Sequence, residues 1–209
     1  MSARIRVLLA DDHSLVRKGF RRLLEDEQGI EVVGEASTGV EAVELARALR
    51  PDVIVMDMSM PGLNGSQATI EILKFLPSAG IVILSMYEEA NYVRNAINAG
   101  ARGYLLKNAS DVNLAAAVRK VARGWKVIDE KLQQPLDPKR RTEPVLTPRE
   151  RQILQLIAEA KSTREIAALL DLSVNTVAVH RANIMDRLGV HKTAELVLYA
   201  VRSGIAQLP

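Results

Sequence analysis

Five side chains that could take part in phosphoryl chemistry stand at the ends of short apolar runs. Asp11 and Asp12 follow IRVLLA, Asp57 ends VIVMD, Ser85 ends GIVILS and Lys107 ends GYLLK. Carboxylates that share one site repel each other and need a cation, and a hard divalent ion such as Mg²⁺ suits oxygen ligands. A carboxylate beside such an ion can attack phosphate, while a lysine and a hydroxyl bind the phosphoryl oxygens.

Each of these residues also has a simpler structural interpretation. Asp57 could be a solvated turn residue after a strand, since Asp is common in turns. Asp11 or Asp12 could cap the following helix, Ser85 could be an ordinary strand-end hydroxyl, and Lys107 a surface charge. A buried β-branched run that ends on an unpaired carboxylate is costly, however. The shared placement of all five residues therefore favours a site.

The apolar runs that must position these residues alternate with helical patterns between residues 4 and 124. The runs are IRVLLA, IEVVGE, DVIVMD, GIVILS and GYLLK, and the helical patterns cover 14–26, 39–49, 65–75, 89–99 and 111–123. Short connections between such units predict an α/β fold, a flavodoxin-like doubly wound sheet of five parallel strands in the order 2-1-3-4-5. In this order the polar strand ends are adjacent and open onto one crevice.

Composition limits the kinds of site that the chain can build. Its 209 residues are 48% hydrophobic, which is enough for two modest cores, and include no Cys and three His. Disulfides, thiolate zinc sites and histidine clusters are therefore excluded. No apolar stretch approaches the ~18 residues of a membrane span, and no signal-cleavage pattern follows the N-terminus. We expect a cytoplasmic protein with no membrane partner.

The character of the sequence changes after Trp125, where the strand-like runs stop. QQPLDPKRRTEP is rich in Pro and charge and reads as a linker, after which only helical patterns remain. We therefore predict a first domain over 1–126, a linker over 127–144 and a small all-α domain over 145–209. The predicted helices of this last domain cover 148–159, 163–170, 174–188 and 192–203.

The C-terminal helices carry clear start signals and a helix-turn-helix pattern. Thr147 to Glu150 and Ser162 to Glu165 form capping boxes, and Ser173 caps the next helix. On that helix one face is predicted to be core, through Val174, Val177, Ile184 and Leu188. The opposite face is free to enter a major groove, and its residues are Asn175, Ala178, Val179, Ala182 and Asn183.

The first half of the chain resembles a known signalling domain. ADDH, VIVMDMSMPGLNG, ILSMY and GARGYLLK, in the five-unit layout, are similar to the receiver domain of bacterial two-component response regulators over residues 4–124. This resemblance implies that Asp57 is the phosphoacceptor and that a histidine kinase is the phosphodonor. It also implies that Asp11, Asp12, Asp57 and the backbone carbonyl of Ser59 bind Mg²⁺.

The same resemblance assigns three further residues. Ser85 and Tyr104 match the hydroxyl and aromatic positions that rearrange on phosphorylation, and Lys107 matches the phosphate-contacting lysine. One difference from many receivers is that Asn108 replaces the Pro that commonly follows this lysine.

The second half resembles a DNA-binding domain. LTPRERQILQ and REIAALLDLSVNTVAVHRANIMDRLGV, within residues 146–203, are similar to the LuxR-type helix-turn-helix output domain of the NarL/FixJ class. The resemblance implies a transcription regulator that binds double-stranded DNA as a homodimer. The expected DNA-binding residues are Asn175, Ala178, Val179, Arg181, Ala182, Asn183 and Arg187. Relatives commonly have Gly at Ala160 and a polar residue at Ala178.

Two other functional classes share part of this pattern. Haloacid-dehalogenase-type phosphatases also use a strand-end Asp, Mg²⁺, a hydroxyl and a Lys, but they place a second Asp two residues after the nucleophile as general acid. This chain has Ser59 there, so we expect no enzyme. A flavodoxin-like cofactor protein would need aromatic residues around a flavin, and the chain has only four Tyr, two Phe and one Trp.

Overall fold

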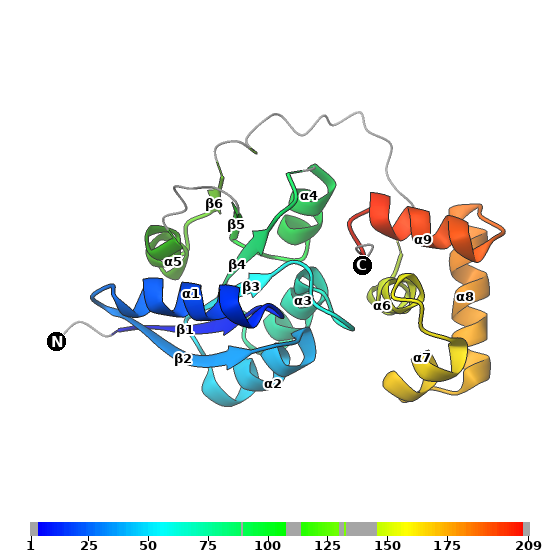
Figure 1. Cartoon of the computed structure of the whole chain (residues 1–209), viewed down its shortest axis with the longest axis horizontal. Helices are drawn as coiled ribbons and strands as arrows, with labels where there is room; N and C mark the ends of the chain where they lie inside the picture. The colour runs from blue at the N-terminus through cyan, green and yellow to red at the C-terminus, as the bar shows by residue number, and fades with distance from the viewer. Residues whose placement is uncertain (1–3, 89, 108–113, 130–131, 133–145, 207–209) are drawn as a thin grey trace. The chain divides into compact units, whose positions relative to one another are not determined.

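The chain divides into two compact units, residues 1–136 and 137–209, and each is described here by itself. A computed structural model describes residues 4–88, 90–107, 114–129, 132 and 146–206 (Figure 1). Among the helices in these ranges, none is long and apolar enough to cross a membrane. Most of the predicted linker and the peptide at Asn108 lie outside the described residues.

The first unit is built on a parallel sheet with the predicted strand order and one additional strand. Its order is β2-β1-β3-β4-β5-β6. The strands are β1 (Ile5–Ala10), β2 (Ile30–Ala36), β3 (Val53–Asp57), β4 (Gly80–Ser85), β5 (Gly103–Leu106) and β6 (Val127–Ile128). The predicted number of five strands is therefore one too low. β6 pairs with Gly103 and Tyr104 of β5, and its two residues are too few to produce a readable periodicity.

Helices cover both faces of this sheet, as the sequence predicts. α1 (Ser14–Glu25) and α5 (Leu114–Ala122) pack on one face, and α2 (Gly39–Leu49), α3 (Gly65–Phe75) and α4 (Ala90–Asn98) pack on the other (Figure 1). Successive strand residues alternate between the two cores because side chains point to opposite faces. In β1, for example, Val7 and Leu9 contact the α1/α5 core, whereas Leu8 and Ala10 contact the other.

The connection from β3 to α3 is held close to the end of its strand. The backbone amide of Gly65 donates to the carbonyl oxygen of Met58 at 2.9 Å, and a Cβ at Gly65 would overlap the carbonyl oxygen of Asp57. Asn64 caps α3 by accepting a hydrogen bond from the amide of Gln67. This turn therefore needs glycine at its closest point, and it fixes the backbone that carries Asp57.

The second unit contains four helices around one core. They are α6 (Pro148–Ala158), α7 (Thr163–Leu169), α8 (Val174–Leu188) and α9 (Thr193–Arg202), and α6 contacts all three others. Both predicted capping boxes are present, at Thr147 and at Ser162, and Ser173 caps α8. Ala160 has a φ of 60°, a left-handed conformation that favours glycine. This explains why glycine suits that position.

We predict that Gly65→Ala lowers the free energy of unfolding by about 1 to 3 kcal/mol, because its methyl group overlaps the Asp57 carbonyl. Gly19→Ala is the matched control, since Gly19 lies inside α1 and a Cβ there meets nothing within 4 Å. That variant should gain up to about 1 kcal/mol from helix propensity. Urea unfolding followed by circular dichroism measures both, and equal stability of the two variants would contradict the close approach.

Candidate functional site

The carboxyl ends of β1, β3 and β5 bring three charged side chains into contact. Asp11 follows β1, Asp57 ends β3 and Lys107 follows β5. The Nζ atom of Lys107 lies 2.7 Å from Oδ2 of Asp11 and 2.9 Å from Oδ2 of Asp57. All three side chains are at least nine-tenths buried. The sequence prediction that these residues meet at one edge of the sheet is thus realised in the geometry.

Asp12 and His13 extend this group toward the surface. Oδ1 of Asp12 lies 2.7 Å from Nδ1 of His13, and the side chain of His13 is 68% exposed. One potential ligand atom from each of Asp11, Asp12, His13 and Asp57 lies within 4.8 Å of the others. The sequence analysis did not include His13 in the group. Its position directly after two acidic residues was the available signal.

The site carries an excess of negative charge that suits a divalent cation. Three carboxylates and one ammonium leave two negative charges without a compensating positive group in this cluster. The donors are carboxylate oxygens, which hard divalent ions such as Mg²⁺ prefer. The residues present therefore fit such an ion.

Burial changes the protonation of the central carboxyl group. Burial, with a smaller contribution from the nearby Asp11, raises the pKa of Asp57 from 3.8 to about 6, against the attraction of Lys107. Burial alone would lower the pKa of Lys107, but the charge of Asp57 and the contact with Asp11 raise it. Lys107 is therefore a cation at neutral pH, and Asp57 is an anion held at a cost.

The loop after β3 contacts the Asp57 carboxylate through its backbone. The amide of Ser59 donates to Oδ1 of Asp57 at 3.2 Å, and the amide of Met58 donates to the carbonyl oxygen of Leu84 at 2.8 Å. These bonds fix the orientation of the carboxylate relative to β4. The role of the Ser59 carbonyl as a metal ligand stays a prediction.

Ser85 and Tyr104 are joined through a residue that the sequence analysis did not identify. The amide of Tyr87 donates to Oγ of Ser85 at 3.1 Å, and the hydroxyl of Tyr104 donates to the carbonyl oxygen of Tyr87 at 2.9 Å. The Tyr87 ring stacks on Tyr92 of α4, with centroids 4.4 Å apart. Ser85 and Tyr104 are both buried. Tyr87 therefore links the end of β4 to Tyr104 of β5 and to α4.

The predicted groove-facing side of α8 is exposed in the second unit. Five residues of this face are solvent-exposed: Asn175, Ala178, Val179, Ala182 and Asn183. Val177 and Ile184 are fully buried, and Leu188 packs against the core from a half-buried position. The prediction that Val174 belongs to this core is wrong, because it is 48% exposed. Val174 lies in the first turn of α8, where the periodic face extends past the edge of the core.

The two arginines of α8 differ in their surroundings. Nη1 of Arg187 forms an ion pair of 3.0 Å with the buried carboxylate of Glu150, whose Oε2 also accepts the amide of Thr147. Arg181 donates to the hydroxyl of Thr193 at 3.3 Å. Arg187 thus joins the C-terminal half of α8 to the start of α6.

Family models match both units. Residues 7–119 match the response regulator receiver domain, and residues 144–200 match the bacterial regulatory proteins of the luxR family. The oxygen regulatory protein NreC of Staphylococcus aureus is 38% identical over 216 residues. That alignment covers 97% of this chain and 100% of NreC.

Solved structures of response regulators are similar as well. The RcsB response regulator of Salmonella typhimurium aligns with a TM-score of 0.60 and 27% identity, over 96% of this chain and 99% of that one. A complex of RcsB with DNA gives a TM-score of 0.60 at 28% identity, over 96% and 98% of the two chains. The response regulator ChrA of a heme-sensing two-component system gives 0.54 at 32% identity, over 97% and 99%.

The raised pKa of Asp57 predicts a pH-dependent stability. The folded protein binds the proton of the Asp57 carboxyl more tightly than the unfolded chain does. The stability that this proton contributes is therefore fully present below about pH 4 and is lost as the pH rises through about 6. Asp57→Asn is neutral at every pH. In the presence of a chelator, its advantage over wild type should grow between about pH 4 and 6, to at most about 3 kcal/mol.

Urea unfolding over this pH range measures the advantage of Asp57→Asn. Asp26→Asn, which removes an exposed carboxylate at the C-cap of α1, controls for the loss of one charge. An advantage that is the same at every pH, or a wild type that is more stable throughout, would contradict the assignment.

Proposed function

The chain belongs to the response regulators that join a receiver domain to a LuxR-type DNA-binding domain, and from this premise we propose that phosphorylation of Asp57 by a histidine kinase controls its binding to DNA. The observation that carries the proposal is the buried contact of Lys107 with both Asp11 and Asp57 at adjacent strand ends. It supports Asp57 as the nucleophile, because this carboxylate lies beside a buried cation and a second acid.

In the proposed transfer, one carboxylate oxygen of Asp57 attacks phosphorus. A P–O bond forms, the P–N bond to the kinase imidazole breaks, and the imidazole nitrogen takes a proton from water. Lys107 already contacts Oδ2 of Asp57 at 2.9 Å, so its ammonium can follow the negative charge onto the phosphoryl oxygens. The amide of Ser59 orients the other carboxylate oxygen.

Mg²⁺ would be held by the carboxylates of Asp11, Asp12 and Asp57 and by the backbone carbonyl of Ser59. When bound, it supplies positive charge that offsets the repulsion between the carboxylates and the incoming phosphoryl oxygens. The excess negative charge of this cluster supports the assignment. Its supply of oxygen donors does so too.

The residue two positions after Asp57 supports a regulator rather than a phosphatase. Ser59 occupies the place where haloacid-dehalogenase-type phosphatases carry a general acid, and its side chain has no ionisable proton in the useful range. The acyl phosphate on Asp57 is therefore proposed to act as a signal. Ser85 and Tyr104 are proposed to respond to it, since Tyr87 joins their positions.

We further propose that α8 enters the major groove of double-stranded DNA. Asn175, Ala178, Val179, Ala182 and Asn183 would face the bases, and Arg181 and Arg187 would contact phosphates. The apolar members of this face favour thymine methyl groups, so sites rich in A·T pairs are expected. On α9, Leu198 is 52% exposed beside Ala194, which suits an apolar contact between two output domains in a homodimer.

Incubation of the full chain with phosphoramidate and Mg²⁺ should give one phosphate adduct in the intact mass. Asp57→Ala should give none, because it lacks the attacking carboxylate, whereas Asp26→Ala should react like wild type. A chelator should also prevent the adduct, because the carboxylate cluster then lacks its cation. An adduct of undiminished yield in Asp57→Ala would remove this residue from its proposed role.

Val179→Ser should weaken binding to the preferred DNA site by about 1 to 3 kcal/mol and leave other sequences unaffected, since Val179 is 52% exposed and proposed to contact thymine methyls. Val40→Ser, an equally exposed valine on α2, is the control. Arg181→Ala should weaken all sequences alike and flatten the salt dependence. Arg187→Ala would not isolate a phosphate contact, because Arg187 also pairs with Glu150.

Selection of binding sites from random duplexes, followed by fluorescence anisotropy at several salt concentrations, measures these DNA effects. The selected sites should be inverted repeats with half-sites about one helical turn apart. Recovery of G·C-rich sites without a dyad, or full binding by Val179→Ser, would show that another face of α8 meets DNA.

A further inference from the structure

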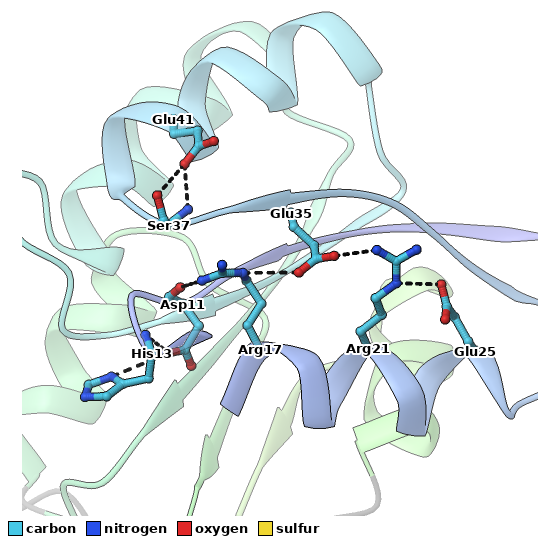
Figure 2. Close-up of polar contacts among 8 residues, drawn as sticks. All are labelled: Asp11, His13, Arg17, Arg21, Glu25, Glu35, Ser37 and Glu41. Atoms are coloured by element: carbon cyan, nitrogen blue, oxygen red, sulfur yellow. Dashed lines mark hydrogen bonds and ion pairs between the residues drawn. The ribbon is translucent and has the colours of Figure 1, made fainter. Parts of the chain in front are cut away.

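A network of charged side chains starts at the backbone of Asp11 and continues along α1 (Figure 2). Nη1 of Arg17 donates to the carbonyl oxygen of Asp11 at 2.5 Å, and Nε of the same guanidinium lies 3.2 Å from Oε2 of Glu35 on β2. The other oxygen of Glu35 pairs with Arg21, which also pairs with Glu25. Arg17 is therefore the member of this network that contacts the turn at Asp11 and Asp12.

The turn between β1 and α1 contains this contact and a local hydrogen bond, in which the amide of His13 donates to Oδ1 of Asp11 at 2.9 Å. The amide of Asp11 is bound by the carbonyl oxygen of Ala36 at 3.1 Å, which continues the ladder to β2. Beyond that point, within the described part of the chain, the N-cap residue His13 makes no capping hydrogen bond through its side chain. The carbonyl oxygen of Asp11 instead accepts from Arg17, six residues further along the chain.

Arg17 is itself held in place. Its side chain is 17% exposed and that of Glu35 is 26% exposed, so both are partly shielded from water. A guanidinium presents its donors in a rigid plane, and charge-assisted bonds to two acceptors fix that plane. Arg21 pairs with the other oxygen of Glu35, so the two guanidinium groups contact this carboxylate through separate atoms.

We propose that Arg17 is a positioning residue for the divalent cation. By holding the Asp11 carbonyl, it sets the backbone of the turn so that the carboxylates of Asp11 and Asp12 already stand at ligand spacing before the ion arrives. The inference rests on the proposed function, in which those carboxylates hold Mg²⁺. It adds a residue that lies outside the ligand set and acts through it.

The test measures Mg²⁺ binding by isothermal titration calorimetry on the full chain, without phosphodonor. Arg17→Met removes the donors and keeps an aliphatic stem, and it should raise the dissociation constant about 10-fold, as loss of a hydrogen-bond partner behind metal ligands does. Arg21→Met is the matched control. It breaks another contact of the same Glu35 but none with Asp11, so its affinity should remain that of wild type.

A second readout separates positioning from a general loss of structure. For Arg17→Met, the Mg²⁺ concentration that half-saturates phosphorylation by phosphoramidate should rise in step with the dissociation constant, while the rate at saturating Mg²⁺ stays near that of wild type. Arg17→Lys keeps the charge but cannot span both acceptors, and it should weaken binding about threefold. It also carries the comparison if Arg17→Met does not fold.

Unchanged Mg²⁺ affinity in both Arg17 variants would overturn the inference, and so would equal weakening in Arg21→Met, because that variant leaves the Asp11 contact intact. If the wild type itself binds no Mg²⁺, the proposed function fails together with this inference. If the wild type binds and the Arg17 variants bind equally well, only the positioning role is lost.

Discussion

Two buried carboxylates share one ammonium group, and the arrangement of the receiver unit follows from that constraint. Asp11 and Asp57 lie at the ends of neighbouring strands, and both the loss of hydration at Asp57 and the nearby charge of Asp11 oppose ionisation of Asp57. Lys107 approaches each within 3 Å from the end of β5 and offsets part of this cost. The remaining negative charge of the cluster, with its carboxylate oxygen donors, suits a divalent cation.

The fold supplies this charge cluster through topology rather than through local sequence. Strand order places the ends of β1, β3 and β4 side by side, and the short turn at Gly65 keeps the backbone of Asp57 in place. The end of β4 is connected to the neighbouring strand and helix, because Tyr87 bonds to both Ser85 and Tyr104 and stacks on Tyr92 of α4. Asp57 at the end of β3 is thus one strand away from the group formed by Ser85, Tyr87 and Tyr104.

Sequence reasoning succeeded where a pattern repeats and failed where contacts are tertiary. The β-branched runs predicted the strand order and the meeting of Asp11, Asp57 and Lys107, because parallel strands end at one edge. β6 was missed because two residues carry no period. Val174 was assigned to the core because a helical period does not show where the core ends. The bridging role of Tyr87 and the contact of Arg17 involve backbone carbonyls, which sequence does not place.

We propose that the phosphoryl group resides on Asp57 and on neither neighbouring acid. Borohydride reduces an aspartyl phosphate to homoserine, so reduction after treatment with phosphoramidate and Mg²⁺, followed by peptide mass spectrometry, locates the modified carboxyl directly. We expect homoserine at position 57 alone, where the carboxylate contacts Lys107 at the end of β3. Homoserine at position 11 or 12, or a modified peptide that lacks residue 57, would contradict it.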